Sequence, residues 1–545
     1  MIDNTPFSLD KTRDGLVDKV ARGEMGVSET VSDIITFDGF LAHWATERPD
    51  RMAMREDDRS YSYAELEHRT AKVAAALFAA GLKRGDRIAW IGKNSDLYFM
   101  LFYGAARVGI VMCPIGWRLA PAEMAFIVND TGAKIIFTGP GFKSLETALQ
   151  GQLNHVDQIL DAASANRLID QAERAAIDPA GPDDAVLQLY TSGTTGNPKG
   201  AVLSNRNLFA LRKHSVDAAH AYTKWDDDEV VLIAMPCAHI GGTGVGIMAM
   251  AAGLPAIVLA EFTPDGVFDA FEHGGATRLF IVPAALQMLI NHPRCSSVDF
   301  SRLKYILYGA APMPLELLRQ CIAMFGAQFI QVYGMTETTG TIVMLPPEDH
   351  DPAGNKRMRS AGKALPGVEL KIVDGEGNEL PFDEVGEVWT RSSNNMLQYW
   401  NLPDATRTTV EAGGWVKTGD AGYLDEDGYL YIHDRVKDMI ITGGENVYPA
   451  EVESAIYGHP DVLEVAVIGI PDDKWGESVK AVCVPKAGAT IDADSIIFWA
   501  RERIAGFKVP KSVDVVAALP RNASGKILRK DLRAPYWEGR ERQVN

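Results

Sequence analysis

Short apolar runs alternate with longer amphipathic segments over most of the chain, from about residue 37 to residue 360. The runs are rich in β-branched residues and end at Gly, Pro or polar residues, which is typical of buried strands. They are RIAWIG, GIVMCPI, KIIFTG, VVLIAMP, AIVLA, RLFIVP and YILYG. Because strands that alternate with helices form parallel sheets covered on both faces, this region predicts an α/β domain of parallel-rich αβα layered sheets.

The pattern changes twice further along the chain. Residues 360–434 contain VELKIVDGEGNELP, GEVWTR and GYLDEDGYLYIHD, which predict strands joined by tight turns and therefore a β-rich subdomain. Beyond them, VYPAEVESAIYGHP and SIIFWARERI predict helices, while EVAVIGIPDD and SVKAVCVP predict strands. We therefore expect a large N-terminal domain over residues 1–434 and a small α+β domain over residues 435–545.

One uncharged stretch is long enough to cross a membrane. Residues 230–260 contain no Asp, Glu, Lys or Arg, and a helix of about 20 apolar residues spans a bilayer. Pro236, Pro255 and five glycines interrupt the stretch, and such breaks disfavour a single span. We expect instead a buried strand, a glycine-rich turn, a core helix and a second strand.

Composition narrows the class of protein. A chain of 545 residues exceeds what one hydrophobic core usually serves, which agrees with two domains. Its 54 Lys and Arg against 72 Asp and Glu give a net charge of −18, which disfavours a nucleic-acid partner. The five cysteines form no CxxC and the N-terminus has no export signal, so we expect a cytoplasmic protein without disulfides or a zinc site. Peripheral contact with a membrane stays open.

The segment TSGTTGNPKG, which begins at Thr191, is the most informative motif. Its hydroxyls, its glycine N–H groups and Lys199 can surround a triphosphate, and glycine permits close approach of the backbone. Pro198 stands where GxxxxGK[ST] requires its second glycine, which disfavours a P-loop kinase or GTPase. The candidate phosphate-binding residues are Thr191, Ser192, Gly193, Thr194, Thr195, Gly196 and Lys199.

Further motifs follow in order along the chain. Each alone has an ordinary structural explanation, such as a turn, a helix entry or an exposed basic loop. They are MPCAHIGG around His239, Gly309-Ala310-Ala311-Pro312, QVYGMTET from Gln331, WVKTGD ending at Asp420, HDRVKD with Arg435 and Lys437, ITGGEN with Gly443-Gly444-Glu445, and PRNASGKI with Lys526.

Together these motifs resemble the adenylate-forming superfamily of acyl-CoA synthetases, firefly luciferase and the adenylation domains of nonribosomal peptide synthetases. The chain looks most like bacterial fatty-acyl and aryl-CoA ligases. The resemblance implies that the small domain is a mobile lid with its hinge near Lys437. It also implies two half-reactions, in which ATP and a carboxylic acid give an acyl-adenylate and pyrophosphate, and CoA then displaces AMP.

The resemblance also assigns roles at the nucleotide. Tyr333 is expected to stack on adenine, Asp420 to bind the ribose hydroxyls, and Arg435 to contact ribose and phosphate. Glu337, with Thr191, is expected to hold Mg2+, since a hard cation prefers carboxylate and phosphate oxygens. The expected catalytic residues are Lys526, Thr194, Thr336, Glu337 and His239. The remaining expected ATP and AMP contacts are Gly309, Ala310, Ala311, Pro312, Gln331, Gly334, Met335, Thr336 and Lys526.

For the second half-reaction, the resemblance places Gly443, Gly444 and Glu445 beside the pantetheine arm of CoA. The expected acyl pocket is formed by His239, Gly242, Gly309, Gly334 and Gly340. Its small residues predict room for a fatty, aryl or otherwise bulky hydrophobic acid. No cation in these segments is placed to hold a second carboxylate.

Two alternatives stay open. A standalone adenylating enzyme would load a carrier protein instead of CoA, and a luciferase-like or non-catalytic adenylate-binding protein would make no thioester. The family-level expectation for assembly is a homodimer.

Overall fold

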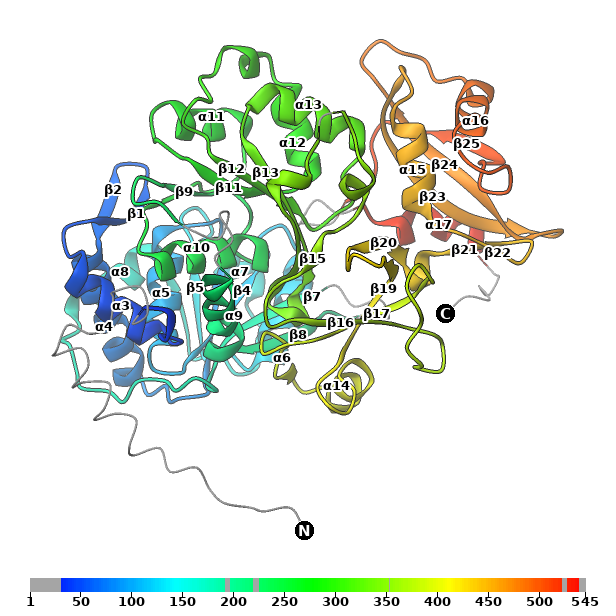
Figure 1. The fold of residues 1–545 in the computed structure, drawn as a ribbon. Helices are drawn as coiled ribbons and strands as arrows, with labels where there is room; N and C mark the ends of the chain where they lie inside the picture. The colour runs from blue at the N-terminus through cyan, green and yellow to red at the C-terminus, as the bar shows by residue number, and fades with distance from the viewer. Residues whose placement is uncertain (1–30, 192–196, 219–224, 352, 522–526, 539–545) are drawn as a thin grey trace.

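The computed structural model describes residues 31–191, 197–218, 225–351, 353–521 and 527–538. Its ribbon has a large part, coloured blue to yellow, and a smaller orange and red part to one side (Figure 1). The candidate residues Ser192, Gly193, Thr194, Thr195, Gly196 and Lys526 lie outside the described residues.

Within the described residues, a nine-stranded sheet has the order β15-β14-β13-β12-β11-β9-β10-β1-β2. Its six central strands pair in parallel, and the three outer strands β2, β14 and β15 pair antiparallel. The strands are β1 (Met52–Glu56), β2 (Arg59–Ser62), β9 (Val231–Ile233), β10 (Ala256–Val258), β11 (Arg278–Ile281), β12 (Tyr305–Gly309), β13 (Gln328–Met335), β14 (Gly340–Leu345) and β15 (Lys363–Ala364).

A second sheet in the described part of the large domain has seven strands in the order β18-β8-β7-β4-β3-β5-β6. Strands β7, β4, β3, β5 and β6 pair in parallel, and β8 and β18 pair antiparallel at one edge. The strands are β3 (Arg87–Ile91), β4 (Val111–Ile115), β5 (Ile135–Thr138), β6 (Gln158–Asp161), β7 (Ala185–Thr191), β8 (Lys199–Ser204) and β18 (Gln398–Tyr399). All seven apolar runs of the α/β region are therefore strands, as predicted.

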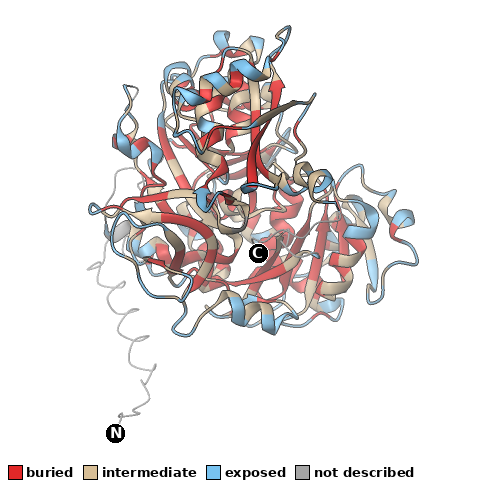
Figure 2. Ribbon diagram, turned by 90° about the vertical axis from the view of Figure 1, so that its right-hand side faces the viewer, coloured by how far each residue is buried: buried red, intermediate tan, exposed pale blue. Residues whose placement is uncertain are grey.

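Helices cover both sheets. Every residue of α5 is buried, and one apolar cluster joins side chains of both sheets, including Met54 of β1 and Trp90 of β3. Figure 2 shows the buried residues concentrated in the sheets and the helices between them. The helices are α3 (Phe37–Glu47), α4 (Tyr63–Ala79), α5 (Asp96–Ala106), α6 (Pro121–Thr131), α7 (Leu145–Leu149), α8 (Ala162–Gln171), α9 (Asn205–Asp217), α10 (Ile240–Ala252), α11 (Pro264–Glu272), α12 (Pro283–Ile290), α13 (Leu315–Phe325) and α14 (Pro403–Thr409). Short 3-10 helices are η2 (Pro293–Ser297), η3 (Thr336–Thr338), η4 (Pro347–Asp349) and η5 (Lys356–Arg359).

The uncharged stretch at residues 230–260 forms β9, a loop, α10 and β10, which is the predicted order of strand, helix and strand. The predicted glycine-rich turn is wrong, because Gly241, Gly242, Gly244 and Gly246 lie within α10. Glycine lets α10 pack closely, since a Cβ at Gly246 would lie 2.3 Å from the ring of Phe99 in α5. In the described ranges, no helix combines the length and the apolar character that a membrane crossing requires.

The predicted β-rich region is an antiparallel sheet in the order β16-β17-β19-β20. Its strands are β16 (Glu369–Val373), β17 (Gly386–Arg391), β19 (Val416–Leu424) and β20 (Leu430–Arg435). The 3-10 helix η6 (Val436–Asp438), which contains Lys437, follows β20 directly.

Beyond η6 the chain builds a separate mixed sheet, in which β25 pairs with β24 of the path β22-β21-β24-β23. Gln287 of α12 joins this part to the large domain, because its Nε2 donates to Tyr457 Oη at 2.8 Å and to the Leu463 carbonyl at 3.1 Å. The elements are β21 (Ile440–Thr442), β22 (Glu445–Val447), α15 (Pro449–Tyr457), β23 (Val462–Asp472), β24 (Gly476–Pro485), α16 (Ala493–Arg501), β25 (Ser512–Val515) and α17 (Arg529–Trp537).

Candidate active site

The two large sheets bring together the two residues expected to hold a metal ion. Thr191 is the last residue of β7, and Glu337 lies in η3, immediately after β13. Thr191 Oγ1 is 3.4 Å from Glu337 Oε1. Glu337 is buried, with only 5% of the residue exposed. A hydroxyl and a buried carboxylate at this distance form an all-oxygen donor set, which suits a hard divalent cation.

Tyr399 of β18 completes this group and was missed by the sequence analysis. Its hydroxyl donates to Glu337 Oε1 at 2.6 Å, and Lys199 Nζ lies 5.2 Å from the centre of its ring. Burial raises the pKa of the Tyr399 hydroxyl, and the charge of Glu337 raises it further. The sequence carries no signal for this contact, since a tyrosine at a sheet edge has no distinctive motif.

A second group joins three residues expected at the nucleoside. Tyr333 Oη donates to Asp420 Oδ2 at 2.7 Å, and Arg435 Nε lies 2.7 Å from Asp420 Oδ1. Asp420 raises the pKa of the Arg435 guanidinium, and Glu337 adds to that effect. Burial raises the pKa of Tyr333 well above its usual value. The structure therefore places strands β13, β19 and β20 around one carboxylate.

The loop at residues 309–312 lies next to β13 and consists of small residues, most of which are exposed. Ala310 has a left-handed φ of 65°, and Ala310, Ala311 and Pro312 are exposed. Gln331 lies in the neighbouring strand, where its Oε1 accepts a hydrogen bond from Tyr308 Oη at 3.1 Å. Tyr308 Oη is in turn 3.0 Å from His350 Nε2. Burial lowers the pKa of His350 to about 4, so its imidazole is neutral near pH 7.

The turn at Gly334 depends on a close approach of two strands. A Cβ on Gly334 would lie 1.7 Å from the carbonyl oxygen of Gly340. Thr339 and Gly340 both have positive φ, at 55° and 93°. Met335 ends β13 and Thr336 opens η3, so this tight turn places Glu337 at its observed position.

His239 is the N-cap residue of α10. It lines a cavity of about 10 Å³ together with Trp117, Arg118 and residues of the 236–238 loop. That volume holds roughly one water molecule, so it does not define an acyl pocket. Arg118 was missed by the sequence analysis at this cavity; Glu261 lies 3.5 Å from it and forms a closer ion pair with Lys93, so the two cations share one carboxylate.

At three of the glycines, the absence of a side chain leaves no free space for a bulky acid, contrary to the prediction from the sequence. A Cβ on Gly242 would lie 2.3 Å from the carbonyl oxygen of Pro236. A Cβ on Gly309 would lie 2.1 Å from the carbonyl oxygen of Val332, and Gly334 is equally restricted. These glycines allow close backbone packing, and their presence says nothing about pocket width. Gly340 differs, since its nearest contact is the Ile240 side chain at 3.4 Å.

Gly443 and Gly444 form the turn between β21 and β22 in the small domain, and Glu445 is the first residue of β22. Both glycines have positive φ, at 62° and 85°, and Gly443 N donates to the Trp475 carbonyl at 2.8 Å. A Cβ on Gly443 would lie 2.7 Å from the Trp475 ring. The turn therefore needs glycine for its own conformation and packing.

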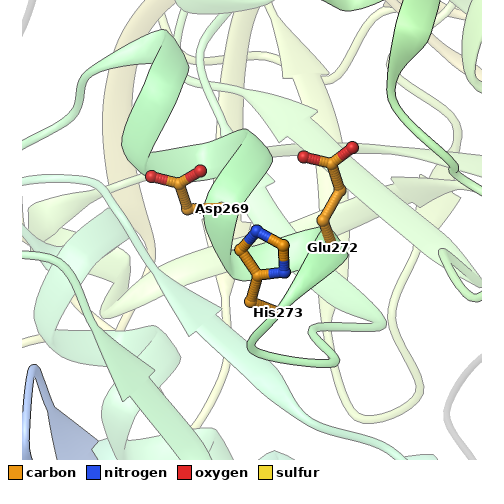
Figure 3. A group of neighbouring side chains, drawn as sticks. All are labelled: Asp269, Glu272 and His273. Carbon is orange, nitrogen blue, oxygen red and sulfur yellow. The ribbon is translucent and has the colours of Figure 1, made fainter.

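One acidic group outside the site has the spacing of metal ligands. Asp269, Glu272 and His273 lie together at the end of α11 (Figure 3). Arg294 Nη2 already lies 2.6 Å from Asp269 Oδ1 and 2.5 Å from Glu272 Oε2. The arginine supplies the positive charge that a cation would bring, and we assign no metal to this group.

Comparison with known proteins agrees with the arrangement of these groups. The family model "AMP-binding enzyme" matches residues 41–400, and the model "AMP-binding enzyme C-terminal domain" matches residues 451–526. The fold and the site thus define an adenylate-forming enzyme. The chain belongs to the AMP-binding enzyme family.

Three relatives show the range of proteins to which the chain is similar. It is 38% identical over 505 residues to the fatty acid–[acyl-carrier-protein] ligase ScoC of Streptomyces coeruleorubidus, covering 92% of this chain and 96% of that protein. It is 38% identical over 505 residues to a feruloyl-CoA synthase of Amycolatopsis, covering 91% and 99%. ATP-bound MatB from Rhodopseudomonas palustris has a similar structure, with a TM-score of 0.83 and 33% identity over 92% of this chain and 99% of that chain.

Proposed function

We propose that this protein is an ATP-dependent carboxylic acid–CoA ligase that forms an acyl-adenylate and then an acyl-CoA. The observation that carries the proposal is the pairing of Thr191 with Glu337 at 3.4 Å, beside Lys199 and near the separate group around Asp420. The first group suits a metal-bound triphosphate and the second a ribose. The chain is also similar to feruloyl-CoA synthase and to the long-chain-fatty-acid–CoA ligase FadD13 of Mycobacterium tuberculosis.

In this proposal, Glu337 and Thr191 would hold Mg2+, which would supply positive charge to neutralise the phosphates. Lys199 adds a second positive charge at the same phosphates, where a hydrogen bond from an ammonium is shorter and stronger than a neutral one. Asp420 accepts from the ribose hydroxyls, and Arg435 holds the orientation of that carboxylate. Tyr333 provides an aromatic face for the adenine beside the exposed 309–312 loop.

Thr194, Thr336 and Lys526 are proposed to stabilise the charge that develops at the α-phosphate when the carboxylate attacks. Groups that are fixed before the reaction stabilise such charge most, because the site does not reorganise during the step. His239 is proposed to lie beside the acyl carboxylate. After pyrophosphate leaves, we propose that the small domain rotates about Lys437 and brings Gly443, Gly444 and Glu445 to the pantetheine arm.

The proposed substrate is a fatty or aromatic hydrophobic monocarboxylic acid. The basis is similarity, because relatives at 36–38% identity include ligases named for ferulate, indoleacetate and long-chain fatty acids. A cytoplasmic location and a homodimer remain predictions from the sequence.

The decisive experiment measures CoA-dependent AMP release across a panel of fatty, aryl and dicarboxylic acids. We expect release with at least one hydrophobic monocarboxylic acid, and its loss when EDTA removes Mg2+. Acid-dependent pyrophosphate release without any thioester would contradict the ligase proposal.

Loading of an acyl carrier protein is the second candidate, because the relative ScoC is named as such a ligase. A parallel assay with free CoA and with a phosphopantetheinylated carrier protein separates the two acceptors. A kcat/KM at least 100-fold higher with the carrier protein would favour this candidate.

A further inference from the structure

Tyr399 touches both charged groups of the proposed phosphate site. Its hydroxyl donates to Glu337 Oε1 at 2.6 Å, and its ring lies 5.2 Å from Lys199 Nζ. The residue is 6% exposed, and its backbone pairs with Ala201 of β8, the strand that begins at Lys199. Tyr399 thus links the carboxylate of Glu337 to β8, the strand that follows the TSGTTGNPKG motif.

We propose that Tyr399 is a positioning residue that fixes the Glu337 carboxylate for the divalent cation that binds with ATP. The inference rests on the metal role proposed for Glu337 and assigns a residue that acts through it. Tyr399 itself would touch neither the cation nor the reacting atoms.

A phenol suits this task because it orients a carboxylate without neutralising it. A lysine or arginine in its place would cancel the charge that attracts the cation, whereas a hydroxyl supplies one directed hydrogen bond. Among the described residues, the hydrogen bonds from Tyr399 and Thr191 both fall on Oε1, which leaves Oε2 for a cation.

The backbone around Tyr399 is held independently of its hydroxyl. Met396 N donates to the Glu337 carbonyl at 2.7 Å, and Trp400 N donates to the Gly200 carbonyl at 2.7 Å. Tyr399 N donates to Thr406 Oγ1 at 3.0 Å. Replacement of Tyr399 by Phe therefore removes one hydrogen bond and leaves the segment anchored.

The test is calorimetric titration of ATP into the full-length protein at a series of Mg2+ concentrations. In Tyr399→Phe we expect the half-saturating Mg2+ concentration for ATP binding to rise about 10-fold or more, because loss of a group that orients a metal ligand typically costs 10–100-fold in metal affinity. ATP binding without metal should change less than 2-fold. In pyrophosphate exchange, the KM for Mg2+ should rise while kcat largely recovers at saturating Mg2+.

Tyr429→Phe is the matched control. Tyr429 Oη also donates to a carboxylate, Asp349 Oδ2, at 2.6 Å, and Tyr429 is 4% exposed. This variant measures the general effect of losing a buried phenol–carboxylate hydrogen bond, and we expect a wild-type Mg2+ dependence. A change in Mg2+ dependence as large as that of Tyr399→Phe would overturn the positioning role.

Glu337→Gln separates the positioning role from the proposed function. If Glu337→Gln keeps the wild-type Mg2+ dependence, the metal role proposed for Glu337 is wrong. If Glu337→Gln loses that dependence but Tyr399→Phe keeps the wild-type half-saturation, the positioning role is wrong and the proposed function stands. A Tyr399→Phe protein that only melts earlier, with unchanged Mg2+ dependence, also overturns the positioning role.

Discussion

Arg435 Nε lies 2.7 Å from Asp420 Oδ1, and Arg435 is the last residue of β20, directly before the helical turn that contains Lys437. The same carboxylate accepts a hydrogen bond from Tyr333 at 2.7 Å. A residue at the entrance to the small domain is therefore joined to the residue proposed to bind ribose. The ion pair therefore connects the nucleotide site to the segment at which the proposed rotation of the small domain would begin.

Asp420→Ala should weaken ATP binding about 10–100-fold, because hydrogen bonds to a charged group contribute roughly 1.5–3 kcal/mol. The variant also leaves Arg435 without this partner. Titration calorimetry with ATP measures the loss, and an ATP affinity within 2-fold of wild type would contradict the ribose assignment. Asp374→Ala in the exposed turn after β16 is the control, and we expect it to leave ATP binding unchanged.

Gly334→Ala should disrupt the turn that positions Glu337. The new Cβ would lie 1.7 Å from a backbone oxygen, and such overpacking typically costs about 1–3 kcal/mol. We expect a lower Tm and at least a 10-fold loss of Mg2+-dependent ATP binding. Gly375→Ala is the control, because a Cβ there meets no atom within 4 Å. Equal melting temperatures for the two variants would contradict the close approach.

Lys526→Ala should abolish acid-dependent pyrophosphate exchange and spare thioester formation from presynthesised acyl-adenylate. The reason is that a cation at the α-phosphate stabilises charge in the first half-reaction, and loss of one such contact typically costs about 3–4 kcal/mol. Rapid-quench assays of the two half-reactions measure the effect. An equal fall in both rates would show that the role is wrongly assigned.

Lys437→Pro should keep adenylation and impair thioester formation, because proline restricts φ at the proposed hinge. The half-reactions are measured separately, with pyrophosphate exchange as the internal control for folding. An unchanged rate of thioester formation would refute rotation about this residue.

His350 should make the protein less stable as the pH falls from about 6.5 to 4. Burial lowers its pKa to about 4 in the folded protein, whereas an unfolded histidine titrates near pH 6.5. The unfolded chain therefore binds more protons in this window, and the stabilisation present above pH 6.5, up to about 3 kcal/mol, is lost as the pH falls through the folded pKa. His350→Gln should flatten this part of a Tm-against-pH profile relative to wild type. Parallel profiles would contradict the effect.

The strands were predictable because each is an apolar run with turn residues at its ends. VVLIAMP and AIVLA became β9 and β10, and the core helix between them was also expected. The order of the motifs along the chain was enough to predict that Thr191, Glu337, Asp420 and Arg435 belong to the candidate site. The packing role of the glycines was not predictable, since it depends on how the backbone folds back: a Cβ at Gly242 would meet the carbonyls of Met235 and Pro236, and a Cβ at Gly309 would meet the carbonyl of Val332 on the neighbouring strand.

The sequence by itself determined the α/β class, the change to β-rich and α+β texture, and the residue types for ATP chemistry, because local hydrophobic periodicity and motif spacing are properties of the chain alone. Only the tertiary structure decided that Tyr399, 62 residues beyond Glu337, donates to its carboxylate, and that Asp420 lies between Tyr333 and Arg435. Such contacts depend on how two sheets and their edge strands pack. Local sequence patterns do not contain that information.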